Sequence, residues 1–455
     1  GQTTARNIYG GGLYGYVGLS DSNLNGYIYE SHNDVRDYLT SATVDFLSGT
    51  AYQVCGGGLM GNIGGETFVN IGSYDATADS NIKITNVYGG NDVTGTIAGS
   101  NNAKYGTNIN IIGGTITGNV YGSGNGQYGI YNQALTEKNM NSLQNAAIGR
   151  EHPHVASAHI NIAGVNEKNK AQVLGTLFLG GNNTTIGQFV KSQFGREEFG
   201  VNREKLIPNS GHAHLNIGSH VYIGNLVMGS NGSHRIDFIP YYTTDGSTWI
   251  KGFENDSSFI EYCQGVDMAC APTLTFNANT TFDEPGLNDS ENVLIDNFIG
   301  GGASGSMCSD SLYNYTLPAG LTINGNIVGG CKNAHFTYTE EEGAEKGKVR
   351  EYVGGFTSHI NDKDKKERIQ LNIFCNFKPL TIIEEKDKKT LRGSYIFGGC
   401  DEYGIINGST KIILHSDLVG KEYANTDDLY KLIKNNTIEG CEVFGGGKGK
   451  NTQVL

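Results

Sequence analysis

Histidines gather in two stretches of the chain and offer metal-ligating chemistry. They are His152, His154 and His159, followed by His212, His214 and His220. Two histidines at positions i and i+2 share one face of a strand and could ligate a metal ion. His159 and His214 also hold the outward polar position that Asn108 holds in a repeated strand pattern, so stacked strands would align them as a polar column. We favour the column over ligation and expect no bound transition metal.

Carboxylates form a second group that could do chemistry. Three acids follow glycine pairs, and five lie in long segments between repeats: Asp92, Asp401 and Glu402, then Asp245, Asp256, Asp267, Asp283 and Asp289. Enzymes that cleave polysaccharides place two or three carboxylates on one face. Spacing selects no such group, because neighbours in a stacked repeat lie tens of positions apart in sequence. We interpret these acids as solvated loop residues, with Asp401 and Glu402 as a weak candidate for binding Ca²⁺.

Tyr241, Tyr242 and Trp249 are the best candidates for recognition. The chain has 25 tyrosines but a single tryptophan, which lies near this tyrosine pair in a long polar segment. Amphipathic aromatic side chains on a loop can stack on sugars or grip a protein partner, and packing on the protein's own core is the alternative. We therefore predict a ligand-binding surface at these three residues.

Charge and hydropathy disfavour two classes of partner. The formal net charge of −13 disfavours nucleic acid and anionic membranes, since both reward basic patches. No window approaches 18 consecutive apolar residues, so we expect no transmembrane segment. The chain starts Gly1-Gln2-Thr3, which is consistent with a processed start and leaves secretion open.

The element that must position these groups is a recurring phrase of two apolar residues followed by a glycine pair. The full and near copies end at these pairs: Gly10-Gly11, Gly56-Gly57, Gly89-Gly90, Gly180-Gly181, Gly300-Gly301, Gly329-Gly330, Gly354-Gly355, Gly398-Gly399 and Gly445-Gly446. Self-similarity at this spacing indicates a stacked repeat in which each unit buries its apolar face against its neighbours. We expect the glycines to form corners that need positive φ, one preceding apolar residue to lie in the core, and the other to be buried at the corner.

The segment from 107 to 126 shows the repeat unit most clearly. It contains three short strand patterns separated by glycines, at 108–112, 115–117 and 119–121. Ile109 and Ile111 alternate with Asn108 and Asn110, which is the period of two expected for a strand with one buried face. We predict an all-β, single-stranded parallel β-helix, in which Ile109/Ile111, Ile160/Ile162, Leu215/Ile217 and Leu371/Ile373 form apolar stacks. A stack of antiparallel hairpins is the alternative.

Phrases such as Asn86-Val-Tyr-Gly-Gly-Asn91 and Ile396-Phe-Gly-Gly-Cys400 resemble the glycine-rich repeats of secreted or surface proteins of Bacteroidota-type bacteria. The resemblance covers most of the chain through short motifs. It implies an adhesin-like β-helix at the bacterial outer surface and transfers no catalytic residue. The long insertions and the cysteines depart from that pattern.

Most of the eight cysteines fit the repeat. Cys331 and Cys400 take the position after a glycine pair and Cys55 takes an apolar position, so we expect small buried packing residues. Cys263 and Cys270, in an insertion, are the one candidate disulfide pair.

Long insertions interrupt the repeat of a single elongated domain over residues 1–455. In the N-terminal half nearly all of them follow the glycine pair, so we expect these to share one side of the domain, and from Phe276 onward a second connection also carries insertions. Their approximate bounds are 128–156, 187–211, 231–271, 277–296, 303–319, 339–350, 356–368, 376–393 and 416–439. Short helices are expected at 134–147 and 426–434. We expect a solvated hairpin arm around the charged runs 362–368 and 384–389.

These patterns favour a non-catalytic extracellular or cell-surface protein that binds a glycan or a surface protein through its loops. A polysaccharide lyase or glycoside hydrolase on the same fold is the main alternative, because its site would be invisible in sequence. A structural subunit of a surface fibre is the second, since the strand edges at each end of a β-helix favour self-assembly. Neither a cofactor nor a nucleic-acid partner is expected.

Overall fold

The computed structural model describes residues 4–13, 17, 41–59, 61, 63–74, 81–93, 95–97, 106–126, 153–191, 204–207, 210–232, 241–243, 249–251, 266–268, 270–277, 293–309, 311–332, 336–337, 367–377, 381–385, 388–392, 394–406, 408–415, 441–449 and 451–454. Every regular element in these ranges is a β-strand. Within them, no helix has the length and apolar character needed to cross a bilayer. The two expected helices lie outside the described residues.

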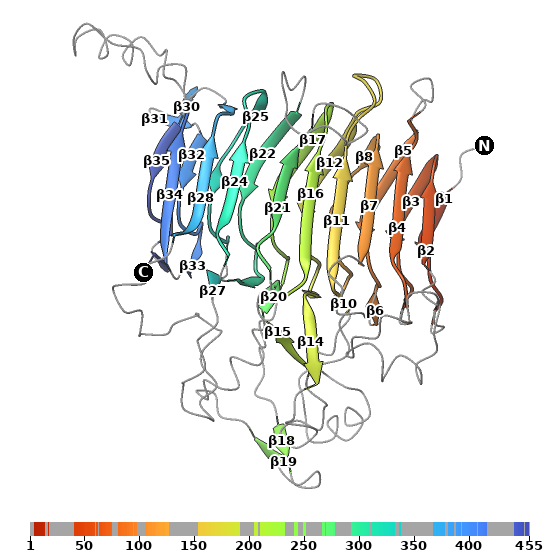
Figure 1. Ribbon diagram of the computed structural model, residues 1–455. Helices are drawn as coiled ribbons and strands as arrows, with labels where there is room; N and C mark the ends of the chain where they lie inside the picture. The colour runs from red at the N-terminus through yellow and green to blue at the C-terminus, as the bar shows by residue number, and fades with distance from the viewer. Residues whose placement is uncertain are drawn as a thin grey trace, which may run out of the picture.

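Four parallel sheets contain most of the strands (Figure 1). The long sheet has 13 strands: β1 (Thr4–Tyr9), β3 (Gly49–Cys55), β5 (Ile82–Tyr88), β8 (Gly114–Ile116), β9 (Val120–Tyr121), β12 (Ala171–Phe178), β17 (Val221–Val227), β22 (Val293–Ile299), β25 (Leu321–Ile323), β26 (Ile327–Val328), β29 (Asn376–Phe377), β32 (Ser394–Phe397) and β35 (Cys441–Phe444). The short-strand sheet has eight: β6 (Thr96–Ile97), β10 (His154–Val155), β13 (Thr185–Ile186), β20 (Val266–Met268), β23 (Ser306–Cys308), β27 (Phe336–Thr337), β33 (Tyr403–Ile406) and β36 (Asn451–Val454).

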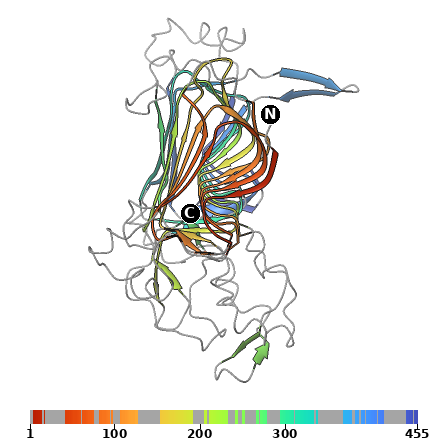
Figure 2. The ribbon, with the colours of Figure 1, turned by 90° about the vertical axis from the view of Figure 1, so that its right-hand side faces the viewer.

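Along the chain from β5 onward, the strands of the other two parallel sheets follow a strand of the short-strand sheet and precede the next strand of the long sheet. The six-stranded sheet contains β2 (Ala42–Phe46), β4 (Thr67–Gly72), β7 (Thr107–Ile112), β11 (Ser157–Ile162), β16 (His212–Ile217) and β21 (Thr273–Phe276). The three-stranded sheet contains β24 (Tyr313–Leu317), β28 (Glu367–Ile373) and β34 (Ser409–Leu414). From β5 onward the chain visits the long, short-strand and six-stranded sheets in turn, and after β22 the three-stranded sheet replaces the six-stranded one. Figure 2 shows the sheets around a common interior.

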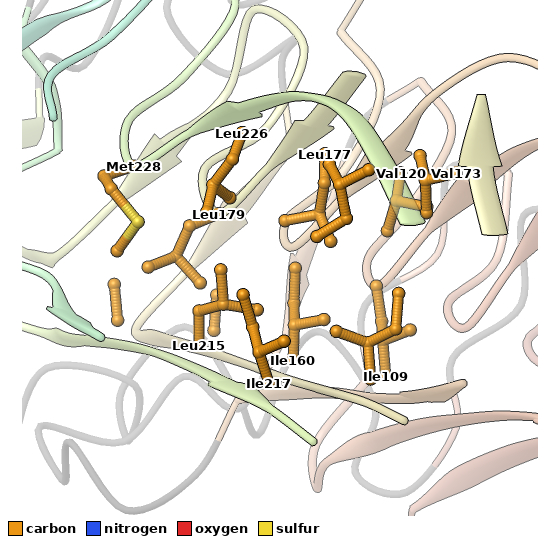
Figure 3. Close-up of a cluster of buried hydrophobic side chains, with 14 of the residues drawn as sticks. Ile109, Val120, Ile160, Val173, Leu177, Leu179, Leu215, Ile217, Leu226 and Met228 are labelled. Carbon is orange, nitrogen blue, oxygen red and sulfur yellow. The ribbon is translucent and has the colours of Figure 1, made fainter. Parts of the chain in front are cut away.

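The predicted apolar stacks are confirmed as the core between the sheets. Ile109, Ile160, Leu215 and Leu371 are all fully buried in one hydrophobic cluster. Figure 3 shows side chains of the six-stranded sheet facing those of the long sheet across this core, with Leu177 and Leu226 among the latter. Alternation along each strand places these residues inward and their polar neighbours outward.

The two apolar residues before each glycine pair have different environments, as expected. One of the two lies in the main core, as Val87 and Val120 do; in Phe178-Leu179 the order is reversed and the second residue, Leu179, lies there. The other belongs to a separate buried column that contains Cys55, Tyr88, Tyr121, Phe178, Val227, Ile299, Val328 and Phe397. Within this column the rings of Tyr88 and Tyr121 stack at 4.9 Å between centroids, and so do those of Tyr121 and Phe178. Successive parallel strands therefore place like side chains directly over one another.

Asparagines form matching polar columns. In the six-stranded sheet three asparagines donate their Nδ2–H to the residue on the preceding strand: Asn161 to Asn110, Asn110 to Asn70 and Asn70 to Asp45, at 2.8 Å each. A second column is buried after the glycine pairs and runs from Asn231 through Asn182 and Asn125 to Asp92. An amide has both a donor and an acceptor, so a stack of asparagines satisfies its members in series.

The expected reason for the glycine pairs is wrong. Among the described pairs given above, such as Gly56-Gly57 and Gly89-Gly90, no glycine has positive φ; the adjacent Gly113 and Gly114, which do, lie at the turn between β7 and β8. A Cβ on Gly89 would instead overlap the carbonyl oxygen of Gly122 on the next strand and lie 2.8 Å from the Cβ of Thr107. The glycine pairs are thus required by close approach between successive repeats rather than by backbone conformation.

Three strand assignments also need correction. The patterns at 115–117 and 119–121 both lie in the long sheet, as β8 and β9. The short-strand sheet is built instead from strands of two to four residues that follow the glycine pairs. Such strands are too short to show alternation. The range 303–319 is not an insertion, since it contains β23 and β24, where Tyr313 and Tyr315 fill core positions normally held by Ile or Leu. Residues 293–296, assigned to an insertion, begin β22.

The remaining insertions fall in two connections of the repeat, as expected. In the sequence, residues 127–152 and 233–265 precede the short-strand-sheet strands β10 and β20, whereas 278–292 and 416–440 precede the long-sheet strands β22 and β35. Three antiparallel hairpins lie in such segments: β14 (Gln188–Lys191) with β15 (Glu204–Ile207), β18 (Tyr241–Thr243) with β19 (Trp249–Lys251), and β30 (Thr381–Glu385) with β31 (Lys388–Arg392). The predicted charged arm is the last of these, but Ile369–Ile373 belongs to the core strand β28.

The cysteine expectations are confirmed in part. Cys331 and Cys400 are fully buried in the main core, and Cys55 is fully buried in the second column. Cys270 is a buried free thiol packed into the main core, so it forms no disulfide. Cys263 lies outside the described residues.

The close approach at the corners predicts a position-dependent cost of adding one methyl group. Gly89→Ala is expected to lower the free energy of unfolding by about 1–3 kcal/mol, because the backbone of the next strand cannot move away. Gly445→Ala, at the equivalent position in the last copy, meets nothing within 4 Å and should change it by less than about 0.5 kcal/mol. Denaturant unfolding of both variants checks this, and equal losses would contradict it.

Candidate functional site

Three of the histidines meet on the outer face of the six-stranded sheet. His159 on β11 and His214 on β16 are register partners, as the repeat pattern predicts, and both align with Asn108 on β7. His212 lies two residues before His214 and so projects from the same face of β16. The ring centroids of His159 and His212 are 5.2 Å apart, and those of His212 and His214 are 6.2 Å apart. We call His159, His212 and His214 the histidine cluster.

Burial and crowding both favour the neutral form of these imidazoles. Desolvation lowers the pKa of all three, and the neighbouring histidines lower the pKa of His159 further, to about 4. A buried cation loses hydration, and a second positive charge nearby repels it. The cluster is therefore uncharged at neutral pH.

A hydrogen-bonded chain orients His214. Thr275 on β21 donates its hydroxyl proton to Oδ1 of Asn216 at 2.9 Å, and that oxygen also accepts from Nδ2 of Asn277 at 2.6 Å. Nε2 of His214 lies 2.9 Å from the same threonine oxygen. Because the threonine proton is already committed, Nε2–H of His214 is the donor, and Nδ1 carries the lone pair. The tautomer follows from this network.

A cavity lies next to the cluster, at the junction of the six-stranded and three-stranded sheets. Its volume is about 400 Å³, and its lining includes Gly211, Cys270, Thr273 and Leu312. Gly211 immediately precedes His212, and Thr273 is the register partner of His214. The cavity and the cluster are thus neighbours along the same strands.

The other histidines do not join the cluster. His220 has a φ of 55° and its Nδ1 lies 3.2 Å from a carboxylate oxygen of Glu167. His154 lies in β10, and His152 falls outside the described residues. Sequence spacing alone could pair His212 with His214. His159, 53 residues before His212, joins them only because β11 pairs in register with β16.

The acids that follow glycine pairs are engaged within the fold rather than free in solvent. Asp92 is only 3% exposed, accepting from the Tyr9 hydroxyl and from Nδ2 of Asn125, each at 2.7 Å. Its expected role as a solvated loop acid is therefore wrong, because it terminates the buried asparagine column. Asp401 and Glu402 lie 2.8 Å and 3.5 Å from the ammonium groups of Lys448 and Lys332. Each carboxylate of the proposed Ca²⁺ pair thus faces a cation of the protein itself.

All three residues of the predicted aromatic site lie in described strands. Tyr241 and Tyr242 lie on β18 and Trp249 on β19, where Trp249 pairs with Thr243. Of the insertion acids, Asp267 lies in β20, and Asp245, Asp256, Asp283 and Asp289 are outside the described residues. The hairpin therefore brings Tyr241, Tyr242 and Trp249 into one two-stranded unit.

No protein-family model, curated protein or solved structure that was compared with the chain matches it. The functional argument therefore rests on the fold and on the geometry of its sites.

The lowered pKa of His159 predicts a pH-dependent contribution to stability. Between about pH 6.5, the usual value in an unfolded chain, and about pH 4, the unfolded chain takes up a proton that folded His159 does not. The wild-type free energy of unfolding should therefore fall as the pH drops through this window. His159→Asn, which copies Asn108, should fall less steeply.

Denaturant unfolding at several pH values measures this effect. His220→Asn is the matched control, since His220 lies outside the histidine cluster and asparagine tolerates its positive φ. Identical pH slopes for wild type and His159→Asn would contradict the assignment.

Proposed function

We propose that the chain forms a single parallel β-helix that serves as a non-catalytic scaffold at the cell surface or outside the cell. The support is the repeating visit to the same sheets in the same order, with every pairing between the stacked strands parallel in the described residues. Such a scaffold buries its core between successive turns and leaves its connections free to vary. Function on this fold belongs to what the connections carry.

The observation that carries the binding proposal is the hairpin of β18 and β19. It forms its own two-stranded sheet, separate from the four parallel sheets, and Figures 1 and 2 draw it away from the stack. It contains Tyr241, Tyr242 and the chain's single tryptophan, Trp249. Large amphipathic rings supply contact area at low cost in conformational entropy, which suits them to bind sugars or proteins. We assign this hairpin the role of contacting a glycan or a protein partner.

The acids that follow the glycine pairs already contact other groups of the protein, which supports a binding role over a catalytic one. General acid and base groups need access to substrate, whereas Asp92 is held in a buried column and Asp401 faces Lys448. A polysaccharide lyase or hydrolase remains the competing proposal, with acids of the insertions as its candidates.

The proposal predicts that binding depends on the aromatic residues of this hairpin. Trp249→Ala is expected to weaken binding of a glycan or protein ligand about tenfold or more, as loss of a central aromatic contact does. The ligand is found by array screening of the purified chain and its affinity measured by calorimetry. Phe189→Ala, in the β14 hairpin, is the matched control and should bind as wild type does.

Two results would overturn the binding role. One is turnover of a polysaccharide that disappears when an insertion acid is changed to its amide. The other is ligand binding that is unaffected by Trp249→Ala and by the double change of Tyr241 and Tyr242 to alanine.

Self-assembly is a second proposal, and the exposure of β35, at the edge of the described long sheet, favours it. Val443 and Phe444 on β35 are 41% and 43% exposed, although the equivalent residues Ile396 and Phe397 on β32 are buried. An added Cβ on Gly445 or Gly446 meets nothing within 4 Å. An exposed strand edge with apolar side chains is a template for pairing with another strand.

This edge predicts concentration-dependent association of the chain. Light scattering coupled to size-exclusion chromatography should show larger species as concentration rises, and Phe444→Glu should reduce them by placing a charge at the edge. Leu174→Glu, at an exposed position within β12, is the control. A monomer at every concentration would contradict the assembly role.

A further inference from the structure

The histidine cluster has the makings of a metal site. One ligand nitrogen from each of His159, His212 and His214 lies within 4.8 Å of the other two. Register determines this convergence: β11 and β16 are adjacent parallel strands, and His212 and His214 share one face of β16. Alignment as a polar column and ligation of a metal are thus compatible, because the alignment itself brings the nitrogens together.

The state of the three imidazoles suits ligation. They are neutral at neutral pH, and only a neutral imidazole offers a lone pair to a metal ion. His214 is also oriented by its bond to Thr275, which leaves Nδ1 as its ligand atom. Histidines that ligate metals typically donate their other N–H to an oriented acceptor of this kind.

The neighbours on the adjoining strands add no competing charge. His159 aligns with Asn108, His212 with Ser157 and His214 with Thr273, all of which are uncharged. The ligand set is therefore three nitrogens without a carboxylate. Hard cations such as Ca²⁺ and Mg²⁺ prefer oxygen ligands, whereas imidazole suits zinc and its neighbours in the first transition row.

We propose that His159, His212 and His214 bind one divalent transition-metal ion, Zn²⁺, with the fourth coordination position open. In a tetrahedral site with Zn–N bonds of 2.0–2.1 Å, the ligand nitrogens lie about 3.3 Å apart. We expect the rings to close to this spacing from the 4.8 Å range by side-chain rotation. The open position accepts water or a donor atom from a bound ligand.

Zinc titration of the full, untagged chain after chelator treatment tests the site directly. Calorimetry should show one equivalent bound. His159→Asn and His212→Ser, which copy the register partners Asn108 and Ser157, should each weaken this binding at least about tenfold. His220→Asn should bind zinc as wild type does. Thr275→Val leaves all three ligands in place and should weaken binding by releasing His214 from its orientation.

Two further measurements keep the test independent of any effect of the substitutions on folding. Circular dichroism of each metal-free variant must match wild type for its affinity to be compared. X-ray absorption of the zinc-loaded wild type should show three imidazole ligands. The proposal is overturned if the wild type binds no zinc, if zinc shows fewer than three imidazole ligands, or if His159→Asn and His212→Ser bind it unchanged.

Discussion

The structure depends on how closely each strand lies to the next at the glycine pairs. Parallel strands are about 4.8 Å apart, and at the corner the backbone of one repeat occupies the space that a Cβ of the previous repeat would need, as Gly122 does above Gly89. This contact sets the register at the end of each long-sheet strand. Once that register is set, most side chains of the described strands lie over a counterpart in the neighbouring repeat, with register shifts in three strand pairs. The core, the aromatic column and the asparagine columns all follow from it.

Stacking in register also explains how polar and titratable groups are arranged. Asparagine columns satisfy themselves because each amide donates in one direction and accepts in the other, and Asp92 closes one column as an acceptor that needs no onward donor. Histidines stacked in the same way behave differently, because two charged imidazoles repel each other. Burial, and after it the repulsion from His212 and His214, lowers the pKa of His159, and the same stacking brings one nitrogen of each ring within 4.8 Å of the others. Stacking in register thus gives a hydrogen-bonded column where the residue is asparagine and a cluster of potential metal ligands where it is histidine.

Much of this arrangement is predictable from the sequence, and the failures have physical causes. Alternation of Ile109 and Ile111 with asparagines identifies core columns because each strand buries only one face. Tyr313 and Tyr315 escape recognition, since a tyrosine whose ring is buried looks polar in a pattern. The sequence does not predict the short-strand sheet, because strands of two to four residues are too short to show an alternation of apolar and polar residues. The third ligand of the histidine cluster is missed because it depends on the register of β11 with β16, which only the three-dimensional fold reveals.

The distance between residues that share a column tests the central claim most directly. Thr43 on β2 and Thr273 on β21 are exposed and five strand spacings apart, and Lys83 on β5 and Asn376 on β29 are exposed and six apart. Spin labels attached through a non-cysteine chemistry should give backbone separations of about 24 Å and about 29 Å by pulsed electron paramagnetic resonance. Narrow distributions that lengthen by one strand spacing between the two pairs are the predicted result. Broad distributions, or separations unrelated to the number of strands between the labels, would contradict the account.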